Sequence, residues 1–95
     1  MAPRKTAEML RVLAGKGFRE EQSHHTFMRF MIGGRKTTIY TFFSHSIDEY
    51  DDRLLGQVAR QLRLKRRQLD DLLDCDMTED GYRTHLVDNG HVILT

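Results

Sequence analysis

The sequence predicts an α+β fold in which helices cover one face of a three-stranded antiparallel sheet, followed by a short helical extension at the C-terminus. Two segments have apolar residues at helical spacing, two β-rich runs flank a glycine pair, and the expected order is helix, strand, strand, strand, helix. Such a sheet leaves its other face open, and we expect a ligand to lie there. The 95 residues make one small domain with a modest two-layer core.

The first helix is expected to end just before Gly15. Leu10, Leu13 and Ala14 recur at helical spacing, and Gly15 and Gly17 supply the usual C-terminal stop. The next five residues, FREEQ, are interpreted as a first strand that leads into a hairpin.

Two β-rich runs, residues 25–32 and 36–43, flank the glycines at positions 33 and 34 and predict a β-hairpin. Side chains alternate between the two faces of a strand, so one set of the first run faces the core. The more apolar set is His24, Thr26, Met28, Phe30 and Ile32. His25 then points away from the core beside Arg29, while the register of the second run stays open.

A second helix is expected over residues 47–62. Ser46 and Glu49 have the Ser-x-x-Glu spacing in which two side chains cap the free amides of a helix start. The apolar positions that follow at three- and four-residue steps are Tyr50, Leu54, Leu55, Val58 and Leu62.

The rest of the chain predicts shorter elements. The helical pattern breaks at Arg63, and a helix over residues 65–75 follows with Leu69, Leu72 and Leu73 inward. A further helix over residues 78–87, ended by an Asn-Gly pair, and a strand over residues 92–94 complete the expected elements. We therefore divide the chain into a domain of residues 1–75 and an acidic extension, residues 76–95, that packs on it or trails from it.

Charge is distributed unevenly, although the net charge is only +1. Residues 1–69 hold 14 Lys and Arg against 7 Asp and Glu, whereas residues 70–95 hold 1 against 7. A basic surface is typical of proteins that bind a phosphate backbone, although solvated helix faces carry the same residues. The acidic segment either shields that surface or caps a helix.

Two absences point to a cytoplasmic protein without a membrane partner. No apolar run approaches the length of a membrane span, and the first ten residues lack the apolar core of a secretion signal. Cys75 is the only cysteine, so the chain forms no internal disulfide, which agrees with a reducing compartment.

The candidates for acid/base chemistry are His24, His25 and His45, because histidine gives and takes protons near neutral pH. Neighbours on a strand face opposite ways, so His24 and His25 share a site only if the strand begins after them. His45 could approach the first strand across the hairpin. Two imidazoles can divide the acid and base roles when a phosphoryl group passes from a leaving 5′-oxygen to a neighbouring 2′-hydroxyl. A purely structural role is the alternative for at least one of the first two.

Cations near these histidines could stabilise the charge that develops on a phosphate. The candidates in the hairpin are Arg29, Arg35 and Lys36. The densest basic cluster comprises Arg60, Arg63, Lys65, Arg66 and Arg67. For both sets, phosphate contact and simple solvation are alternative interpretations.

No metal or cofactor site is expected. The histidines lack ligand pairs at i, i+3 or i, i+4 spacing, and Cys75 has no partner thiol for a structural zinc site. His85 and His91 are isolated in the tail. Neither a glycine-rich phosphate loop nor a nucleophile-elbow motif occurs.

The chain resembles the HicA toxin family, in particular its longer members. The similarity covers residues 5–82 and rests on GKGF at the end of the first helix, SHHTF at the second strand, GGRKTTIYTFFSH at the turn and third strand, and QLRLKRRQLDDLLDCDMTEDGY thereafter. Their order and spacing carry the resemblance together, because no single motif is diagnostic. The resemblance implies a fold similar to a double-stranded-RNA-binding domain.

The resemblance also implies a ribonuclease that cleaves messenger RNA without a metal, works from a histidine on the sheet, and is neutralised by a HicB-type antitoxin covering that site. The family histidine maps to the SHH segment, where the face argument favours His25 and the Ser-His form of shorter members favours His24. Two alternatives stay open. One is a noncatalytic module that holds RNA through Arg and Lys contacts to phosphate, and the other is a protein-interaction scaffold that uses the open sheet face.

Overall fold

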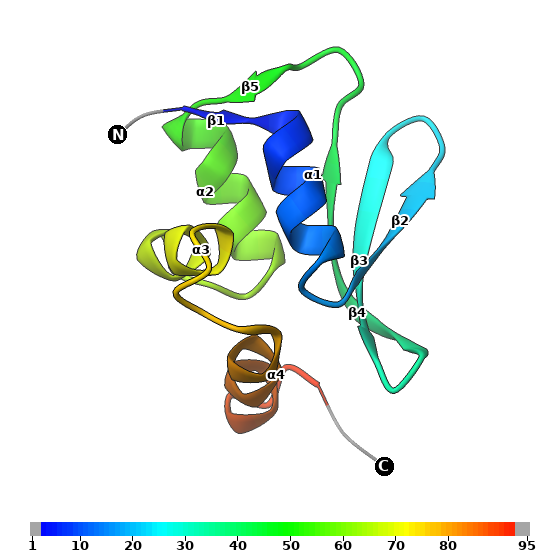
Figure 1. The fold of residues 1–95 in the computed structure, drawn as a ribbon, viewed down its shortest axis with the longest axis vertical. Helices are drawn as coiled ribbons and strands as arrows, with labels where there is room; N and C mark the ends of the chain where they lie inside the picture. Colours follow the sequence, from blue (N-terminus) through cyan, green and yellow to red (C-terminus); the bar gives the residue numbers. More distant parts are fainter. Residues whose placement is uncertain (1–2, 93–95) are drawn as a thin grey trace.

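The computed structural model describes residues 3–92, and its main layer is a three-stranded antiparallel sheet (Figure 1). Strands β2 (Phe18–Gln22), β3 (Thr26–Ile32) and β4 (Arg35–Phe43) pair in the order β2-β3-β4. The predicted α+β class with a three-stranded antiparallel sheet is therefore confirmed.

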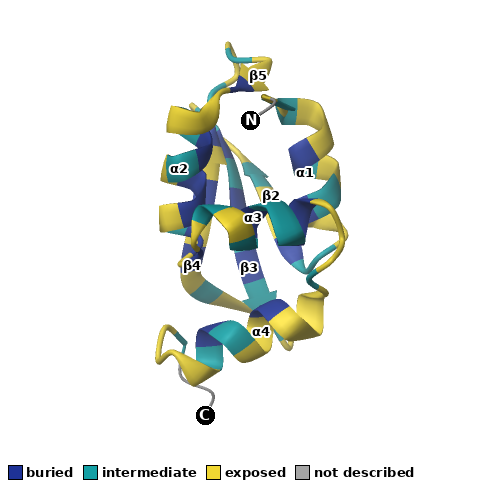
Figure 2. Ribbon diagram, turned by 90° about the vertical axis from the view of Figure 1, so that its left-hand side faces the viewer, coloured by how far each residue is buried: buried dark blue, intermediate teal, exposed yellow. Residues whose placement is uncertain are grey.

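Four helices accompany the sheet within residues 3–92: α1 (Thr6–Ala14), α2 (Asp52–Gln61), α3 (Arg66–Leu73) and α4 (Glu79–Asp88). Helix α1 contacts β2 and β3, and α2 contacts β4. Figure 2, turned to look from the helix side, shows α1, α2 and α3 in front of the strands. None of these helices combines the length and the apolar character that a bilayer crossing requires.

The β3–β4 hairpin turns at Gly33 and Gly34, as the glycine pair predicts. Their φ angles are 58° and 79°, the positive values that a two-residue type I′ turn requires and that glycine adopts without steric cost. The turn pairs Ile32 with Arg35 and so sets the register of the two strands.

The register shifts once further along this hairpin. Arg29 lies opposite Tyr40 and Met31 opposite Lys36, so three residues of β4 oppose one of β3. The Thr37 hydroxyl bridges the irregularity by donating to the Phe30 carbonyl at 2.7 Å. It also accepts from the amide of the second residue after it, at 3.1 Å. Because the insertion adds an even number of residues, the alternation of faces continues through it.

The core lies between the sheet and the helices. In β3, Thr26, Met28 and Phe30 are buried, as the alternation predicts, and in β4 every second residue from Ile39 to Phe43 is buried. The apolar residues that face them from the helices include Met9, Leu13, Leu55, Val58, Leu62, Leu69 and Leu72.

The start of the second helix differs from the prediction. Residues Glu49–Tyr50 form a short strand, β5, which pairs with β1 (Arg4–Lys5). The helix begins at Asp52, and the Asp51 carboxylate caps it by accepting from the Leu54 amide at 2.9 Å. The expected Ser46–Glu49 capping box was wrong, because pairing with the N-terminal strand holds this segment extended, a contact between residues far apart in sequence.

Helices α3 and α4 agree with the sequence pattern. The three leucines predicted to face inward from α3 are buried. Thr78 caps α4 by accepting from the Gly81 amide at 3.0 Å, and α4 ends at Asp88 with Asn89 as its C-cap. The strand expected over residues 92–94 falls mostly outside the described residues, and Val92 itself lies in a bend.

Tyr82 attaches α4 to the rest of the fold. Its ring is buried, with centroids 4.9 Å from Phe30 and 5.7 Å from Phe18. Its hydroxyl donates to the Leu62 carbonyl at 2.7 Å. Burial raises the pKa of Tyr82 far above its usual range, so the ring stays a neutral hydrogen-bond donor. The C-terminal segment thus packs against one end of the sheet and the corner between α2 and α3.

An ion-pair network joins the N-terminal strand to α2 and α3. Arg4 lies 2.9 Å from Asp70 and 2.9 Å from Asp74, and Arg66 pairs with Asp70 and, at 3.3 Å, with Asp52. Asp70 and Asp74, which belong to the acidic residues 70–95, therefore bind Arg4 and Arg66 of the basic residues 1–69 within the fold.

Gly17 gives a test of the connection between α1 and β2. Its φ is 89°, and a Cβ there would lie 2.7 Å from the Glu79 side chain. We expect Gly17→Ala to lower the free energy of unfolding by about 1–2 kcal/mol, mainly through the unfavourable φ, because the flexible Glu79 chain can move aside. Gly56→Ala, inside α2 with open space around it, is the matched control and should raise stability by about 0.5–1 kcal/mol. Urea unfolding measures the free energy of unfolding of both variants. Equal changes in the two would contradict the conclusion that the backbone at Gly17 disfavours a side chain.

Stability should fall in acid. The hydrogen bond from Arg4 holds the pKa of Asp74 below its usual value; for Asp70, burial raises the pKa, but hydrogen bonds from Arg66 and Arg4 outweigh it. A carboxylate whose pKa is lowered by folding contributes stability above its unfolded pKa and loses it as the pH falls through the folded pKa. The midpoint of thermal unfolding should therefore drop below about pH 4.

The variant Arg4→Met tests this origin. It removes the partner of both carboxylates, so the loss of thermal stability between pH 7 and pH 3 should be smaller than in the wild type. Arg11→Met, an exposed arginine on α1, is the control and should keep the wild-type loss. An equal loss in all three proteins would show that the network does not carry the acid response.

Candidate functional site

The sheet face turned away from the helices carries aromatic side chains that stay exposed. Tyr40 is 40% exposed and Phe42 is 38% exposed, and Phe27 beside them on β3 is half-buried. Exposed large apolar side chains gathered on one face commonly mark a binding surface. We call this surface, together with the charged residues of the same strand faces, the open face.

The rings of the open face form a continuous row. The His25 ring lies 5.3 Å from Phe42 between centroids, Phe42 lies 5.8 Å from Phe27, and Phe27 lies 6.0 Å from Tyr40. The guanidinium of Arg29 then stands 4.8 Å above the Tyr40 ring, within cation–π range. Such a row offers flat apolar surfaces to a planar partner, with an imidazole at one end and a cation at the other.

His25 lies at the end of the turn that joins β2 to β3. The turn comprises Ser23, His24 and His25, and the Ser23 amide donates to the His25 carbonyl at 3.0 Å. The Nδ1 atom of His25 is buried and has no hydrogen-bond partner among residues 3–92, although the residue as a whole is only half-buried. A buried unpartnered nitrogen costs free energy, and such groups are often retained at functional sites.

His24 is exposed at the apex of the same turn. The alternation that assigned it to the core side does not apply, because β3 begins only at Thr26. His24 and His25 therefore both lie at one end of the sheet, and neither is enclosed in the core.

His45 lies near the same end but contacts the other face. Its Nε2 is 3.1 Å from the Gln22 side-chain oxygen, which also accepts from the Thr26 hydroxyl at 3.1 Å. Thr26 is buried on the helix side of the sheet, whereas His25 packs on Phe42 of the open face. The structure thus brings His45 across the hairpin, as expected, but does not bring its imidazole to that of His25.

Glu21 on β2 binds two of the predicted cations. Lys36 lies 3.0 Å from one carboxylate oxygen and Arg29 lies 3.5 Å from the other. The hydrogen bond from Lys36, and then that from Arg29, holds the pKa of Glu21 below its usual value. Arg29 also donates to the Thr37 carbonyl at 3.0 Å. The carboxylate therefore positions both cations and neutralises part of their charge.

Arg35 and Lys36 lie far from the histidines along the sheet. They pair with Ile32 and Met31, whereas Thr26 follows the histidines at the other end of β3. Six residues of strand separate Thr26 from Ile32, which corresponds to about 20 Å. Lys36 and His25 can therefore contact one elongated partner but not one phosphate group, whereas Arg35 has the parity of Ile39 and so lies on the other face of the sheet.

The second basic cluster is not part of the open face. Arg66 is engaged by Asp70 and Asp52, and Arg67 is exposed on α3. Arg63 and Lys65 line a pocket beside α4. Within residues 3–92, no three His, Cys, Asp or Glu side chains gather as a metal site would require.

Sequence reasoning missed the aromatic row. Phe27, Tyr40 and Phe42 were assigned no role, because the register of β4 was left open. A two-residue turn at the glycine pair already places Arg35 opposite Ile32, and counting from there puts the even-numbered residues of β4 on the open face. Arg19 on β2 pairs with Arg29 and is exposed, and it too was assigned no role.

Taken together, the open face combines an accessible imidazole, flat rings and cations held by one carboxylate. An imidazole can move a proton, rings can stack on unpaired bases, and cations can contact phosphates. Comparison with protein-family models, curated proteins and solved structures finds no match for this chain.

The pairing of Glu21 can be tested directly. In Lys36→Met, the pKa of Glu21 should rise toward the ordinary glutamate value of about 4.3, because the hydrogen bond that lowers it most is lost. Carboxyl-carbon NMR titration measures it. The neighbouring variant Arg35→Met is the control and should leave the Glu21 titration unchanged. The same midpoint in wild type and Lys36→Met would contradict the ion pair.

Proposed function

We propose that the protein is a metal-independent endoribonuclease that cleaves single-stranded regions of messenger RNA from the open face, with His25 as its principal catalytic residue. One observation carries this proposal. The His25 imidazole, half-buried overall, stands at the rim of an exposed aromatic row with Nδ1 enclosed. Among residues 3–92, no group forms a hydrogen bond with this enclosed nitrogen, so hydrogen bonding within the fold does not account for its burial.

In the proposed reaction, His25 takes the proton of a ribose 2′-hydroxyl, whose oxygen then attacks the adjacent phosphorus. The bond to the 5′-oxygen breaks, solvent or His24 protonates that oxygen, and a 2′,3′-cyclic phosphate and a 5′-hydroxyl result. His24 lies in the same turn and is exposed, which suits the second role. His45 is not assigned a part, because it binds Gln22 on the other side of the sheet.

The rings support a single-stranded substrate. Unpaired bases stack on aromatic side chains, at about 1–3 kcal/mol per base, whereas bases within a duplex are already stacked on each other. Phe27, Tyr40 and Phe42 follow His25 along the face, and the cations lie further on. An extended RNA strand laid along β3 and β4 would meet the rings with its bases and Arg29 and Lys36 with its phosphates.

We propose further that the protein acts in the cytoplasm as the toxin of a toxin–antitoxin pair, and that a HicB-type antitoxin neutralises it by covering the open face. The order α1, β2, β3, β4, α2 supports the related proposal that the core resembles a double-stranded-RNA-binding domain. An exposed aromatic patch is also the kind of surface that a protein partner buries.

A noncatalytic RNA-binding module is the second candidate function. Glu21 favours it, because a carboxylate that neutralises Arg29 and Lys36 reduces the charge available to a phosphate in a transition state. The two candidates predict the same binding surface and differ only in whether the RNA is cut.

Cleavage of a short single-stranded RNA by the purified protein in EDTA tests the proposal. His25→Ala should lower kcat/KM by about 10²–10⁴-fold, the usual contribution of a general acid or base. His24→Ala should lower it by at most about tenfold, because solvent can protonate the leaving oxygen. The products should carry 2′,3′-cyclic phosphates, identified by mass spectrometry.

A substrate with 2′-deoxyribose at the scissile position separates cutting from binding. It should bind as the all-ribose strand does and remain uncut. Binding without cleavage of either strand would favour the noncatalytic candidate. Cleavage unchanged in His25→Ala would remove His25 from the mechanism.

A further inference from the structure

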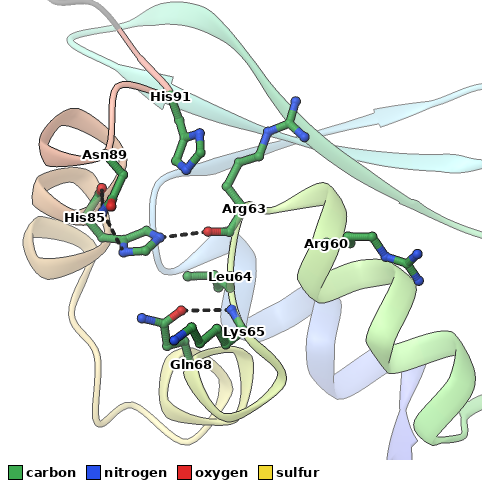
Figure 3. Close-up of a pocket in the computed structure, with 8 residues that line it drawn as sticks. All are labelled: Arg60, Arg63, Leu64, Lys65, Gln68, His85, Asn89 and His91. Atoms are coloured by element: carbon green, nitrogen blue, oxygen red, sulfur yellow. Dashed lines mark hydrogen bonds between the residues drawn. The ribbon is translucent and has the colours of Figure 1, made fainter.

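A polar pocket lies where α4 meets the corner between α2 and α3, away from the aromatic row. Its volume is about 460 Å³, within the range of roughly 300–1,000 Å³ that is typical of small-ligand pockets. Figure 3 shows His85 projecting from α4 toward the Arg63 carbonyl and Asn89 turned back onto His85, with Arg60 on α2 and Gln68 on α3.

A hydrogen bond joins the two walls of this pocket, and others order each wall. His85 Nε2 lies 2.7 Å from the Arg63 carbonyl, and the Asn89 side-chain amide donates to the His85 carbonyl at 2.8 Å (Figure 3). On the opposite side, the Lys65 amide donates to the Gln68 side chain at 2.8 Å. Because a carbonyl accepts only, His85 donates through Nε2, and its tautomer is set. The pocket is thus formed by structured elements.

Arg63 occupies a backbone conformation that favours glycine. Its φ is 62°, in the left-handed region, and its carbonyl is the one that His85 binds. The following residue, Leu64, is buried and anchors the segment. A long charged side chain at a position where glycine is easier to accommodate indicates a role for the side chain, since the turn itself does not need it.

The pocket gathers positive charge without a carboxylate. Arg60, Arg63 and Lys65 line it with His85 and His91, whose rings lie 6.2 Å apart between centroids, and no Asp or Glu is among its lining residues. The acidic residues of the same part of the chain lie elsewhere. Asp70 and Asp74 bind Arg4 on the N-terminal strand, and Asp80 pairs with Arg83 on α4.

We infer that this pocket binds a phosphate group, carried either by a free nucleotide or by an RNA strand. A guanidinium fork matches the oxygens of phosphate, and the Lys65 ammonium and the His91 imidazole supply further donors. The pocket can hold a nucleotide-sized ligand, and it gives the C-terminal segment a role, because α4 supplies one wall. The inference does not rest on the proposed function, since the pocket uses no residue of the open face.

Isothermal titration with inorganic pyrophosphate, ADP and adenosine tests the inference on the full chain. Pyrophosphate and ADP should bind, whereas adenosine, which lacks phosphate, should not. A six-nucleotide RNA with a 5′-phosphate, compared with its 5′-hydroxyl form, distinguishes the sources. If the 5′-phosphate strengthens binding of the strand and Arg63→Gly abolishes that gain, the pocket takes the phosphate of an RNA strand; if the two strands bind alike while ADP binds, it takes a free nucleotide. Failure of both pyrophosphate and ADP to bind at millimolar concentration would overturn the inference.

Arg63→Gly is the decisive variant, because it removes the guanidinium and relieves the left-handed strain, so the protein should fold at least as well. Its affinity for pyrophosphate should fall at least tenfold. Arg60→Ala should weaken binding as well, and Arg53→Ala, an exposed arginine at the start of the same helix, is the matched control and should not. Unchanged affinity in Arg63→Gly would contradict the inference. His25→Ala should bind pyrophosphate normally even if RNA cleavage is lost, so that this site and the proposed function fail separately.

Discussion

The register of the β3–β4 hairpin determines which side chains the sheet presents to each of its faces. The positive φ angles of Gly33 and Gly34 make a two-residue turn, and the later insertion in β4 adds an even number of residues. An insertion of one residue would have turned Tyr40 and Phe42 into the core and the residues between them out to solvent. The hydrophobic core and the aromatic row are therefore two consequences of one pairing.

Local patterns predicted most of the fold. Helical spacing located α1, α3 and α4, and the glycine pair located the hairpin, because these signals depend on residues close in sequence. The start of α2 was missed because Glu49–Tyr50 pairs with Arg4–Lys5, more than forty positions away, and holds as a strand a segment whose own pattern suits a helix start. The insertion at Thr37 could not be predicted either. There the Thr37 hydroxyl takes the place of a backbone hydrogen bond, and no sequence pattern indicates such a substitution.

The candidate site was predicted residue by residue rather than as a surface. His25 was chosen because alternation directs it away from the core, and the structure places it beside Phe42, a neighbour that only the strand pairing reveals. The cations were chosen for their proximity in sequence, which carries no information about Glu21 on another strand. Likewise His85 and His91 are isolated in the chain, yet they meet because α4 ends in a turn that brings His91 back toward His85.

The acidic C-terminal segment does not cancel the basic regions that precede it. Asp70 and Asp74 are used to hold Arg4, and on the open face Glu21 is the carboxylate that the cations bind. Both regions keep more cations than carboxylates, but in different arrangements. On the sheet Arg29 and Lys36 gather at Glu21, and the imidazole of His25 lies further along the strands beyond the aromatic row, an elongated arrangement that suits a long polyanion, whereas Arg60, Arg63 and Lys65 line one pocket beside α4. Geometry, more than the amount of charge, therefore separates a surface suited to a nucleic-acid chain from one suited to a single phosphate group.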